Sequence, residues 1–130
     1  MSNDSLIKWS LDIKNPVEMS IESLIDDNQG LKVIAKSYPN KERTIKITFQ
    51  DYLTYRNTNE SYLLKLWSNI PDEMLGFTFY KIDNSSYIKY FHEMSLGVYI
   101  DWEIIHYGIY TGQDCIDILA TQEPSVVIEE

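Results

Sequence analysis

Hydrophobic and polar residues alternate along several short stretches of the chain, a pattern typical of half-buried strands. Residues 6–13 alternate in this way, and Pro16 follows at a point where a strand cannot continue. Residues 44–50 alternate again, and residues 52–57 keep the same phase, which predicts one strand that continues past a bend. Alternating or apolar runs also predict strands over residues 31–37, 76–82, 104–110, 115–120 and, at a sheet edge, 126–128.

Apolar residues at helical spacing predict three helices between these strands. Two of them cover residues 17–26 and 60–69. The third follows Asn84 or Ser85, either of which can cap a first helical turn. It ends near Gly97, a residue that readily takes the left-handed conformation found at helix C-termini.

Together these elements predict one α+β domain over residues 1–130. We expect a mainly antiparallel sheet of roughly five to seven strands, with two or three helices packed on one side of it. The apolar face of each element is expected to form the core. Its predicted members are Ile7, Trp9, Ile45, Ile47, Phe49, Phe77, Phe79, Phe91, Ile105, Ile109, Ile116 and Ile118.

A hairpin is the most specific local prediction. Gly112 and Gln113 provide a two-residue turn between the last two long strands. This turn sets a register in which Gly108 lies opposite Asp117, and alternation then separates two faces. We expect the face with Ile105, Tyr107, Ile109, Ile116 and Ile118 to lie on the core. The opposite face groups His106, Tyr110, Cys115 and Asp117.

The polar face of this hairpin leaves several interpretations open. It is compatible with a binding patch, with a Cys115–His106 pair that a carboxylate orients, with a solvent-exposed face, or with a face that a helix covers. A nucleophilic thiolate needs an electropositive surrounding, whereas Cys115 lies among acidic residues. We therefore expect no catalytic role for this face.

Motifs of common cofactor and metal sites are missing from the sequence. The single cysteine, Cys115, excludes an internal disulfide and a four-cysteine zinc site. The five glycines form no phosphate-binding loop. His92 and Glu93 begin a zinc-protease pattern, but Leu96 stands where the second histidine is required. We expect no metal, no cofactor and no catalytic residue.

Charge is distributed unevenly along the chain. The chain has 11 Lys and Arg residues against 20 Asp and Glu residues, a net charge of −9. Residues 66–130 contain eleven acids and only two bases, Lys81 and Lys89, so that half carries the whole excess. Such a surface repels nucleic acid and anionic membranes and attracts a basic protein, although the same net charge is also explained if it simply keeps a small protein soluble. The N-terminal residues are polar and lack a secretory signal, so we expect a cytoplasmic protein.

Acidic residues in this half are interleaved with aromatic ones. Asp101 and Glu103 flank Trp102, and Asp114 and Asp117 lie beyond the hairpin turn. Paired carboxylates can catalyse glycoside hydrolysis, but that reaction needs a sugar cleft that a small domain rarely builds. Aromatic residues ringed by charge are more typical of a protein-binding surface. The expected partner surface comprises Asp101, Trp102, Glu103, His106, Tyr110, Asp114 and Asp117.

Two stretches resemble a known group of proteins. Residues 106–118, followed by Glu123 and Pro124, are similar to the C-terminus of small uncharacterised bacterial proteins, and residues 47–60 are similar to their central part. Some such proteins resemble the immunity proteins that are encoded beside secreted polymorphic toxins. The resemblance rests on strand patterns and implies a toxin-neutralising role without enzymatic activity.

The leading hypothesis is therefore an intracellular, non-enzymatic protein that binds and blocks a basic toxin domain. A structural or regulatory interaction domain, which includes a homodimeric one, is the first alternative. A small-molecule binder that uses the His106 face is the second.

Overall fold

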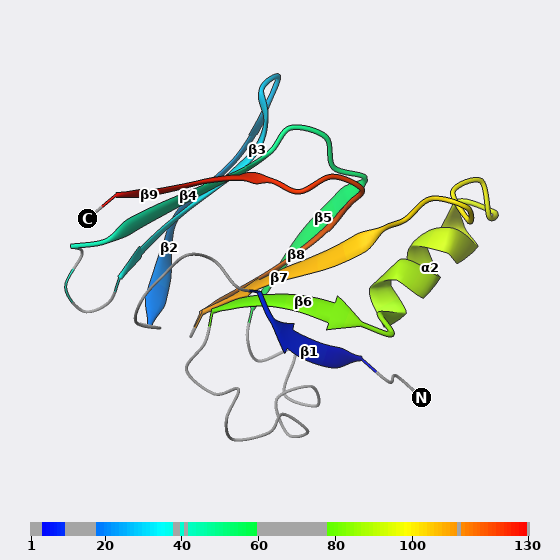
Figure 1. Cartoon of the computed structure of the whole chain (residues 1–130), viewed down its shortest axis with the longest axis horizontal. Helices are drawn as coiled ribbons and strands as arrows, with labels where there is room; N and C mark the ends of the chain where they lie inside the picture. Colours follow the sequence, from blue (N-terminus) through cyan, green and yellow to red (C-terminus); the bar gives the residue numbers. More distant parts are fainter. Residues whose placement is uncertain are drawn as a thin grey trace.

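The computed structural model describes residues 4–9, 18–37, 40, 42–59, 78–111 and 113–129. These residues form two antiparallel sheets and one α-helix (Figure 1). The four-stranded sheet occupies the upper left of the view, the five-stranded sheet the centre, and the helix the right-hand side. Within the described ranges, no helix has the length and apolar character that a membrane crossing needs.

The five-stranded sheet joins strands that are far apart in the sequence. Its spatial order is β1-β6-β7-β8-β5, and each neighbouring pair is antiparallel. The strands are β1 (Ser5–Lys8), β6 (Phe79–Asp83), β7 (Ile105–Tyr110), β8 (Asp114–Ala120) and β5 (Thr54–Asn59).

The four-stranded sheet has the spatial order β2-β3-β4-β9, again antiparallel throughout. Its strands are β2 (Met19–Asp27), β3 (Gly30–Ser37), β4 (Thr44–Phe49) and β9 (Ser125–Glu129). Residues 50–53 and 121–124 are the two short links that carry the chain between this sheet and the five-stranded one.

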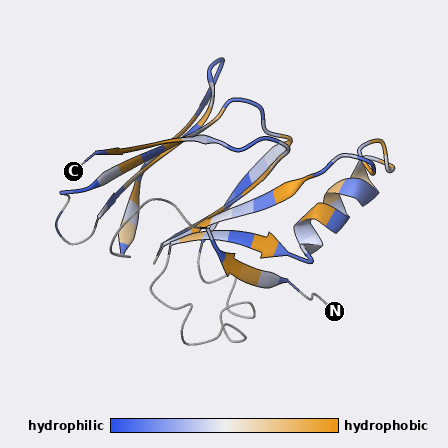
Figure 2. Ribbon diagram, viewed as in Figure 1, coloured by the Kyte–Doolittle hydropathy of each residue, from blue (hydrophilic) through white to orange (hydrophobic). Residues whose placement is uncertain are grey.

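The hydrophobic core lies between the two sheets. Every second residue of β3 and β4 faces it, as do alternate residues of β7 and β8, which explains the strict alternation of these strands. Figure 2 shows hydrophobic residues on the strands of both sheets. The buried core residues are Met19, Leu31, Val33, Ala35, Ile45, Ile47, Phe49, Phe79, Tyr107, Ile109, Ile116, Ile118 and Ala120.

The opposite face of the five-stranded sheet is also covered. The helix α2 (Ser86–Met94) packs there, and its Tyr87 ring lies 5.5 Å from the His106 ring of β7, measured between centroids. The five-stranded sheet therefore lies between the four-stranded sheet and α2, and both faces of β7 and β8 are buried.

The predicted α+β class is wrong, because two sheets and a single short helix make up the described residues. The helix predicted over residues 17–26 is strand β2. A β-bulge between Ile21 and Ser23 shifts the alternation, so that Ile21 and Leu24 both face the core three residues apart. This bulge gives a strand the apolar spacing of a helix.

Residues 52–57 do not continue strand β4. They belong mostly to β5, which lies in the other sheet beside β8. The strands predicted over residues 31–37, 44–50, 104–110 and 115–120 are confirmed, and so is the edge strand near residue 127. The predicted helix over residues 60–69 lies outside the described residues.

Most of the predicted core is confirmed. Ile45, Ile47, Phe49, Phe79, Ile109, Ile116 and Ile118 are buried. Trp9, Phe91 and Ile105 are only partly buried, and Ile7 is 49% exposed because β1 lies at a sheet edge. Phe77 lies outside the described residues.

Candidate functional site

The hairpin has the predicted register. Gly108 pairs with Asp117, His106 with Leu119 and Tyr110 with Cys115. Gly112 lies outside the described residues, but the Thr111 amide donates a 2.8 Å hydrogen bond to the Asp114 carbonyl, which closes the hairpin end. His106, Tyr110, Cys115 and Asp117 therefore share one face, as predicted, and that face is the one that α2 covers.

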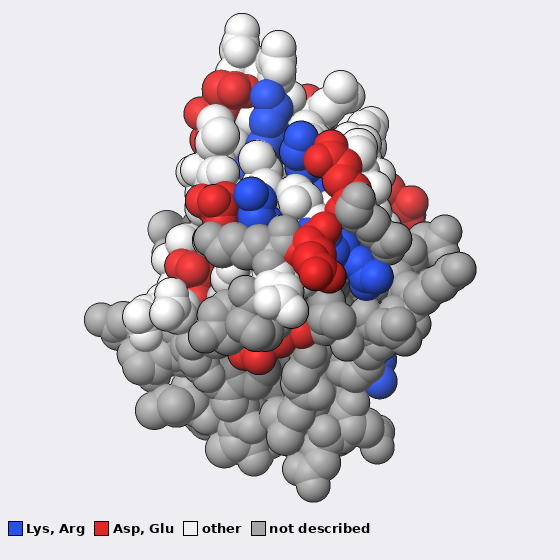
Figure 3. Space-filling view, turned by 90° about the vertical axis from the view of Figure 1, so that its left-hand side faces the viewer, with Lys and Arg blue, Asp and Glu red and all other residues white. Residues whose placement is uncertain are grey.

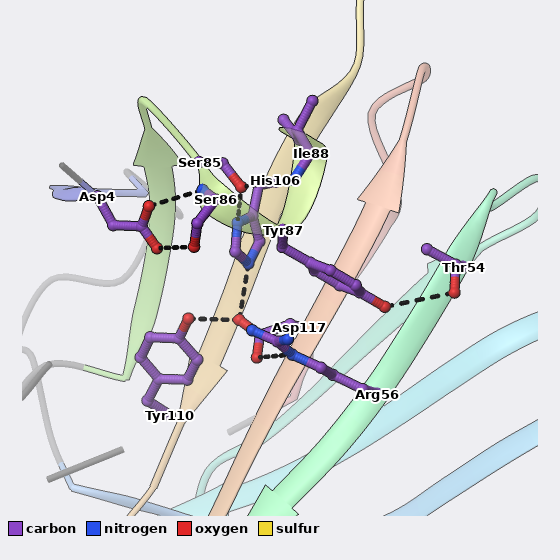
Figure 4. Close-up of polar contacts among 10 residues, drawn as sticks. All are labelled: Asp4, Thr54, Arg56, Ser85, Ser86, Tyr87, Ile88, His106, Tyr110 and Asp117. Carbon is purple, nitrogen blue, oxygen red and sulfur yellow. Dashed lines mark hydrogen bonds and ion pairs between the residues drawn. The ribbon is translucent and has the colours of Figure 1, made fainter. Parts of the chain in front are cut away.

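Asp117 is the centre of a buried polar network (Figure 4). Its Oδ1 atom accepts hydrogen bonds from the Tyr110 hydroxyl at 2.5 Å and from His106 Nε2 at 2.7 Å. Its Oδ2 atom accepts a 3.1 Å bond from Arg56 Nε. With three donors around it, a carboxylate that is only 1% exposed has the partners that a buried charge requires.

Gly108 provides the space that this arrangement needs. A Cβ atom at this position would lie 2.7 Å from Cζ and 2.9 Å from the hydroxyl oxygen of Tyr110. The Tyr110 side chain therefore lies over the backbone of Gly108 to reach Asp117 on the neighbouring strand. A glycine within a buried strand often marks this kind of close approach.

The network continues from His106 to the start of α2. Ser85 is the N-cap of this helix, and its Oγ atom accepts a 3.0 Å hydrogen bond from the Ile88 amide. The same oxygen lies 2.7 Å from His106 Nδ1. Besides accepting from the Ile88 amide, Ser85 Oγ can either donate its proton to Nδ1 or accept one from Nδ1–H, depending on which ring nitrogens carry protons.

Local charges fix the protonation of the carboxylate and the phenol. Burial alone would raise the pKa of Asp117, but the hydrogen bond and charge of His106, the Tyr110 hydroxyl and the Arg56 guanidinium together lower it. Burial, followed by the nearby Asp117 carboxylate, raises the pKa of Tyr110 well above its ordinary value. Tyr110 is therefore a neutral donor to an ionised carboxylate.

The network reaches solvent at Arg56. The Arg56 guanidinium carbon lies 4.1 Å from the centre of the Tyr87 ring, and its side chain is partly exposed. The Tyr87 hydroxyl is 3.3 Å from Thr54 Oγ1. Strand β5 therefore contributes a cation that is held by a carboxylate on one side and an aromatic face on the other.

A second capping contact ties the N-terminal segment to the same helix. Asp4 Oδ1 accepts a 2.7 Å bond from the Ser86 amide, and Asp4 Oδ2 accepts a 3.1 Å bond from the Ser86 hydroxyl. An acidic residue at a helix N-terminus satisfies an unpaired amide and interacts favourably with the helix dipole.

The order serine, histidine, aspartate also occurs in acyl-transfer enzymes. Here, however, Ser85 caps a helix, and Ser85, His106 and Asp117 are all buried. The hydroxyl of Ser85 has no open approach for an acyl donor in this arrangement. The geometry therefore supports a structural role, in which the chain of hydrogen bonds fixes α2 on the sheet.

The residues of the predicted partner surface separate into two groups. His106, Tyr110 and Asp117 are buried in the network and so do not reach a partner in this structure. Asp101, Trp102 and Glu103 are exposed, in the segment that follows α2. Asp114 is partly exposed at the start of β8, where its carboxylate is 3.4 Å from Asn57 Nδ2.

The exposed group belongs to a segment of consecutive turns. The amides of Val98, Ile100 and Trp102 donate to carbonyls three residues earlier, at 3.1, 3.1 and 2.9 Å. Leu96 is 91% exposed, Val98 72% and Ile100 62%, and Met94 and Trp102 are also more than half exposed. We call these five apolar side chains, together with the exposed acids Glu93, Asp101 and Glu103, the turn surface.

Aromatic packing supports this segment from beneath. The Tyr99 ring lies 5.4 Å from that of Phe91 and 4.7 Å from that of Trp102, measured between centroids. Tyr99 is half-buried, whereas the residues on either side of it are exposed. The segment therefore presents its apolar side chains outward from a packed base.

Sequence reasoning identified only the end of this surface. Leu96, Val98 and Ile100 were not predicted as part of it. The signal is the apolar alternation of Leu96, Val98 and Ile100, which lies between the C-terminus of α2 at Met94 and the acids at residues 101 and 103. That pattern resembles a half-buried strand, although here it lies on exposed turns.

A cavity is a further candidate site outside the network. It lies near the two links between the sheets, and its lining residues are Thr48, Phe49, Gln50, Asp51, Gln122, Glu123 and Ser125, none of them from the network. In the part of the chain that the structure describes, no three His, Cys, Asp or Glu side chains are grouped so that they could hold a metal ion. Comparisons of the chain with protein-family models, with curated proteins and with solved structures gave no match.

Proposed function

We propose that this protein is a non-enzymatic, cytoplasmic binding domain that blocks a basic protein through its turn surface. The observation that carries the proposal is the run of exposed apolar side chains from Met94 to Trp102. Exposing so much apolar area in one short segment is unfavourable in water, and such patches are typical of interaction sites. A tryptophan at the edge of the run is a frequent anchor in protein interfaces.

The charges around this surface favour a basic partner. Glu93, Asp101 and Glu103 are exposed beside the apolar side chains, and the chain as a whole has a net charge of −9. A partner with a basic rim around an apolar groove would match both features. Opposite charges at the rim would also accelerate the encounter.

The resemblance to immunity proteins supports a toxin domain as this partner. Neutralisation by occlusion needs tight binding over an essential surface of the toxin and no chemistry in the binding protein. The buried network then serves to hold α2, from which the turn surface continues. It joins the N-terminus of the helix at Ser85 to the start of β7 at His106, the strand that follows the turn surface.

The decisive experiment uses the product of a toxin gene adjacent to the gene for this chain. The two purified proteins are combined, and their association and dissociation rates are measured by surface plasmon resonance. We expect Leu96→Ser and Trp102→Ala to raise the dissociation rate, and a Trp102 hot spot corresponds to about 2 kcal/mol or more.

A matched control uses another exposed apolar residue. Ile25→Ser replaces a partly exposed isoleucine on β2, in the four-stranded sheet, and should leave both rates unchanged. If the two turn-surface variants bind as tightly as the unmodified protein, the turn surface is not the binding site. If no basic protein encoded nearby binds at all, the toxin hypothesis is wrong.

A further inference from the structure

The four outer strands of the two sheets differ in how their edges are protected. β1 has only four residues, β2 contains a bulge and several acids, and β5 is polar along its length. Short strands, charges and bulges all prevent an edge from pairing with another strand. β9, with the sequence Ser-Val-Val-Ile-Glu, has no bulge, and its one charged residue, Glu129, is paired with Lys46 of β4 at 3.4 Å.

Strand β9 pairs with β4 on one side only. Among the described residues, no strand pairs with its other side, so the backbone groups there lack a ladder partner. Val126 and Ile128 face the core but are only half-buried, and Val127, on the outer face, is 51% exposed. These three residues form the most β-prone edge of the described structure.

We propose that β9 pairs with β9 of a second copy of this chain, in antiparallel orientation about a two-fold axis at Val127. The sequence of the strand is complementary to itself in this register. Val127 lies opposite Val127 of the other copy, Val126 opposite Ile128, and Ser125 opposite Glu129. No two like charges face each other, and four half-buried side chains gain apolar neighbours.

The charges on the outer face of this sheet are compatible with such a pairing. Figure 3 shows Lys and Arg side chains beside Asp and Glu side chains at this end of the molecule. Lys32 is 3.7 Å from Asp27, and Lys46 is 3.4 Å from Glu129, so these two lysines of the face have acidic neighbours within the same copy. Repulsion between two copies is therefore weaker here than it would be at the turn surface, where Glu93, Asp101 and Glu103 are exposed.

The two-fold pairing also closes on itself. It uses the free edges of both β9 strands, and the resulting eight-stranded sheet ends at a bulged, acidic β2 strand on each side. Further growth is disfavoured, so a dimer is expected and not a fibre. The turn surface lies at the right-hand end of Figure 1 and β9 at its left, so a dimer leaves that surface open. This inference does not depend on the proposed function.

Sedimentation velocity of the full chain over a concentration series tests the proposal, and we expect a monomer–dimer equilibrium. Val127→Glu should weaken dimerisation at least about tenfold, because two glutamates then face each other at the axis. Within one copy the new glutamate faces Lys46, so folding should be retained, as circular dichroism can verify. Ile25→Glu is the matched control, because it places a glutamate opposite Lys32 at the β2 edge of the same sheet. It should leave dimerisation unchanged.

Mixing two variants tests the register itself. Val127→Lys alone should dimerise as weakly as Val127→Glu, whereas a mixture of the Val127→Lys and Val127→Glu proteins should form mixed dimers, detected by native mass spectrometry. In a third variant, Val127→Cys, oxidation should link two copies covalently, whereas Ile25→Cys should not. The native thiol, Cys115, is buried and does not compete.

Three results would overturn the proposal. The first is a chain that sediments as a monomer at every concentration. The second is a dimer that persists in folded Val127→Glu, or that is lost equally in Ile25→Glu. The third is a Val127→Cys protein that forms no covalent dimer.

Discussion

The hydroxyl of Tyr110 on β7 donates a 2.5 Å hydrogen bond to Asp117 on β8. To reach it, the Tyr110 side chain passes over Gly108, the residue that pairs with Asp117. The bond exists because Gly108 leaves room for the phenol ring above its backbone. This contact links the packing of the hairpin to the electrostatics of the buried network. The requirement for glycine at position 108 can therefore be tested by substitution.

Gly108→Ala should destabilise the fold by about 1–3 kcal/mol, because the new methyl group overlaps the Tyr110 ring and the Ile82 side chain. Urea unfolding measures the loss. The same substitution in a Tyr110→Ala background should cost clearly less, because the ring that it meets is gone. Equal costs in the two backgrounds would show that the ring is not what excludes a side chain at residue 108.

Asp117→Asn should cost about 3 kcal/mol or more, because it leaves His106, Tyr110 and Arg56 around a group that no longer carries a charge. Asp114→Asn is the control, since this residue lies on the same strand and its partly exposed carboxylate accepts a weak, 3.4 Å hydrogen bond from Asn57. It should change the free energy of unfolding by less than about 0.5 kcal/mol. Similar costs for both variants would contradict a special role for the network.

The protein should lose stability in strong alkali. Burial raises the pKa of Tyr80 and of Tyr107 to about 12, and burial together with Asp117 raises that of Tyr110 well above its ordinary value. Each folded phenol therefore holds its proton above pH 10, where an unfolded tyrosine releases it, so stability falls as the pH rises beyond about 10. Tyrosinate absorbance should appear together with loss of the far-ultraviolet circular dichroism. If these phenols ionise near pH 10 while the fold persists, their burial is incorrectly assigned.

Asp117 should make the stability of the fold depend on pH at the acidic end of the range. Its folded pKa is below the ordinary value of 3.8, so its contribution is complete above that pH and is lost as the pH falls through the folded pKa. Acid unfolding should therefore be steeper for the unmodified protein than for Asp117→Asn, when the free energy of unfolding is followed below pH 4. Parallel curves would indicate that another carboxylate dominates.

Reversing the charges of the turn surface should lower the association rate with a partner more than it raises the dissociation rate. Asp101→Lys combined with Glu103→Lys should lower the association rate with a basic partner about tenfold at low salt. The effect should shrink as salt is added, because screening limits the reach of the field to about 8 Å at physiological ionic strength. Glu42→Lys, an exposed reversal on the turn between β3 and β4, is the control. An unchanged association rate would reduce the acidic half to a solubility feature.

Local patterns were sufficient to predict the hairpin and the start of α2. A two-residue turn and strict alternation fix the register of β7 against β8, and Ser85 has the side chain that an N-cap needs. The grouping of His106, Tyr110 and Asp117 on one face follows from that register alone. Its burial does not, because it depends on which element covers the face.

Other features depend on contacts that sequence patterns do not contain. The β2 bulge makes a strand imitate helical spacing, and the apolar alternation at residues 96–102 belongs to turns on the surface. Arg56 reaches Asp117 across 61 positions of sequence, which required the pairing of β5 with β8 to be known. Such long-range pairing determines both the fold class and the membership of the network.

The strand orders also determine when the chain can fold during synthesis. β4 is made early, but one of its two ladder partners is β9, at residues 125–129, and β5 likewise waits for β8. Neither sheet is complete until these late residues have left the ribosome, so the apolar faces of β3 and β4 are exposed in the nascent chain. Pairing between such distant segments is slow, on the order of milliseconds to seconds for all-β domains. A chaperone that shields β3 and β4 during this interval would act on the fold at its most vulnerable stage.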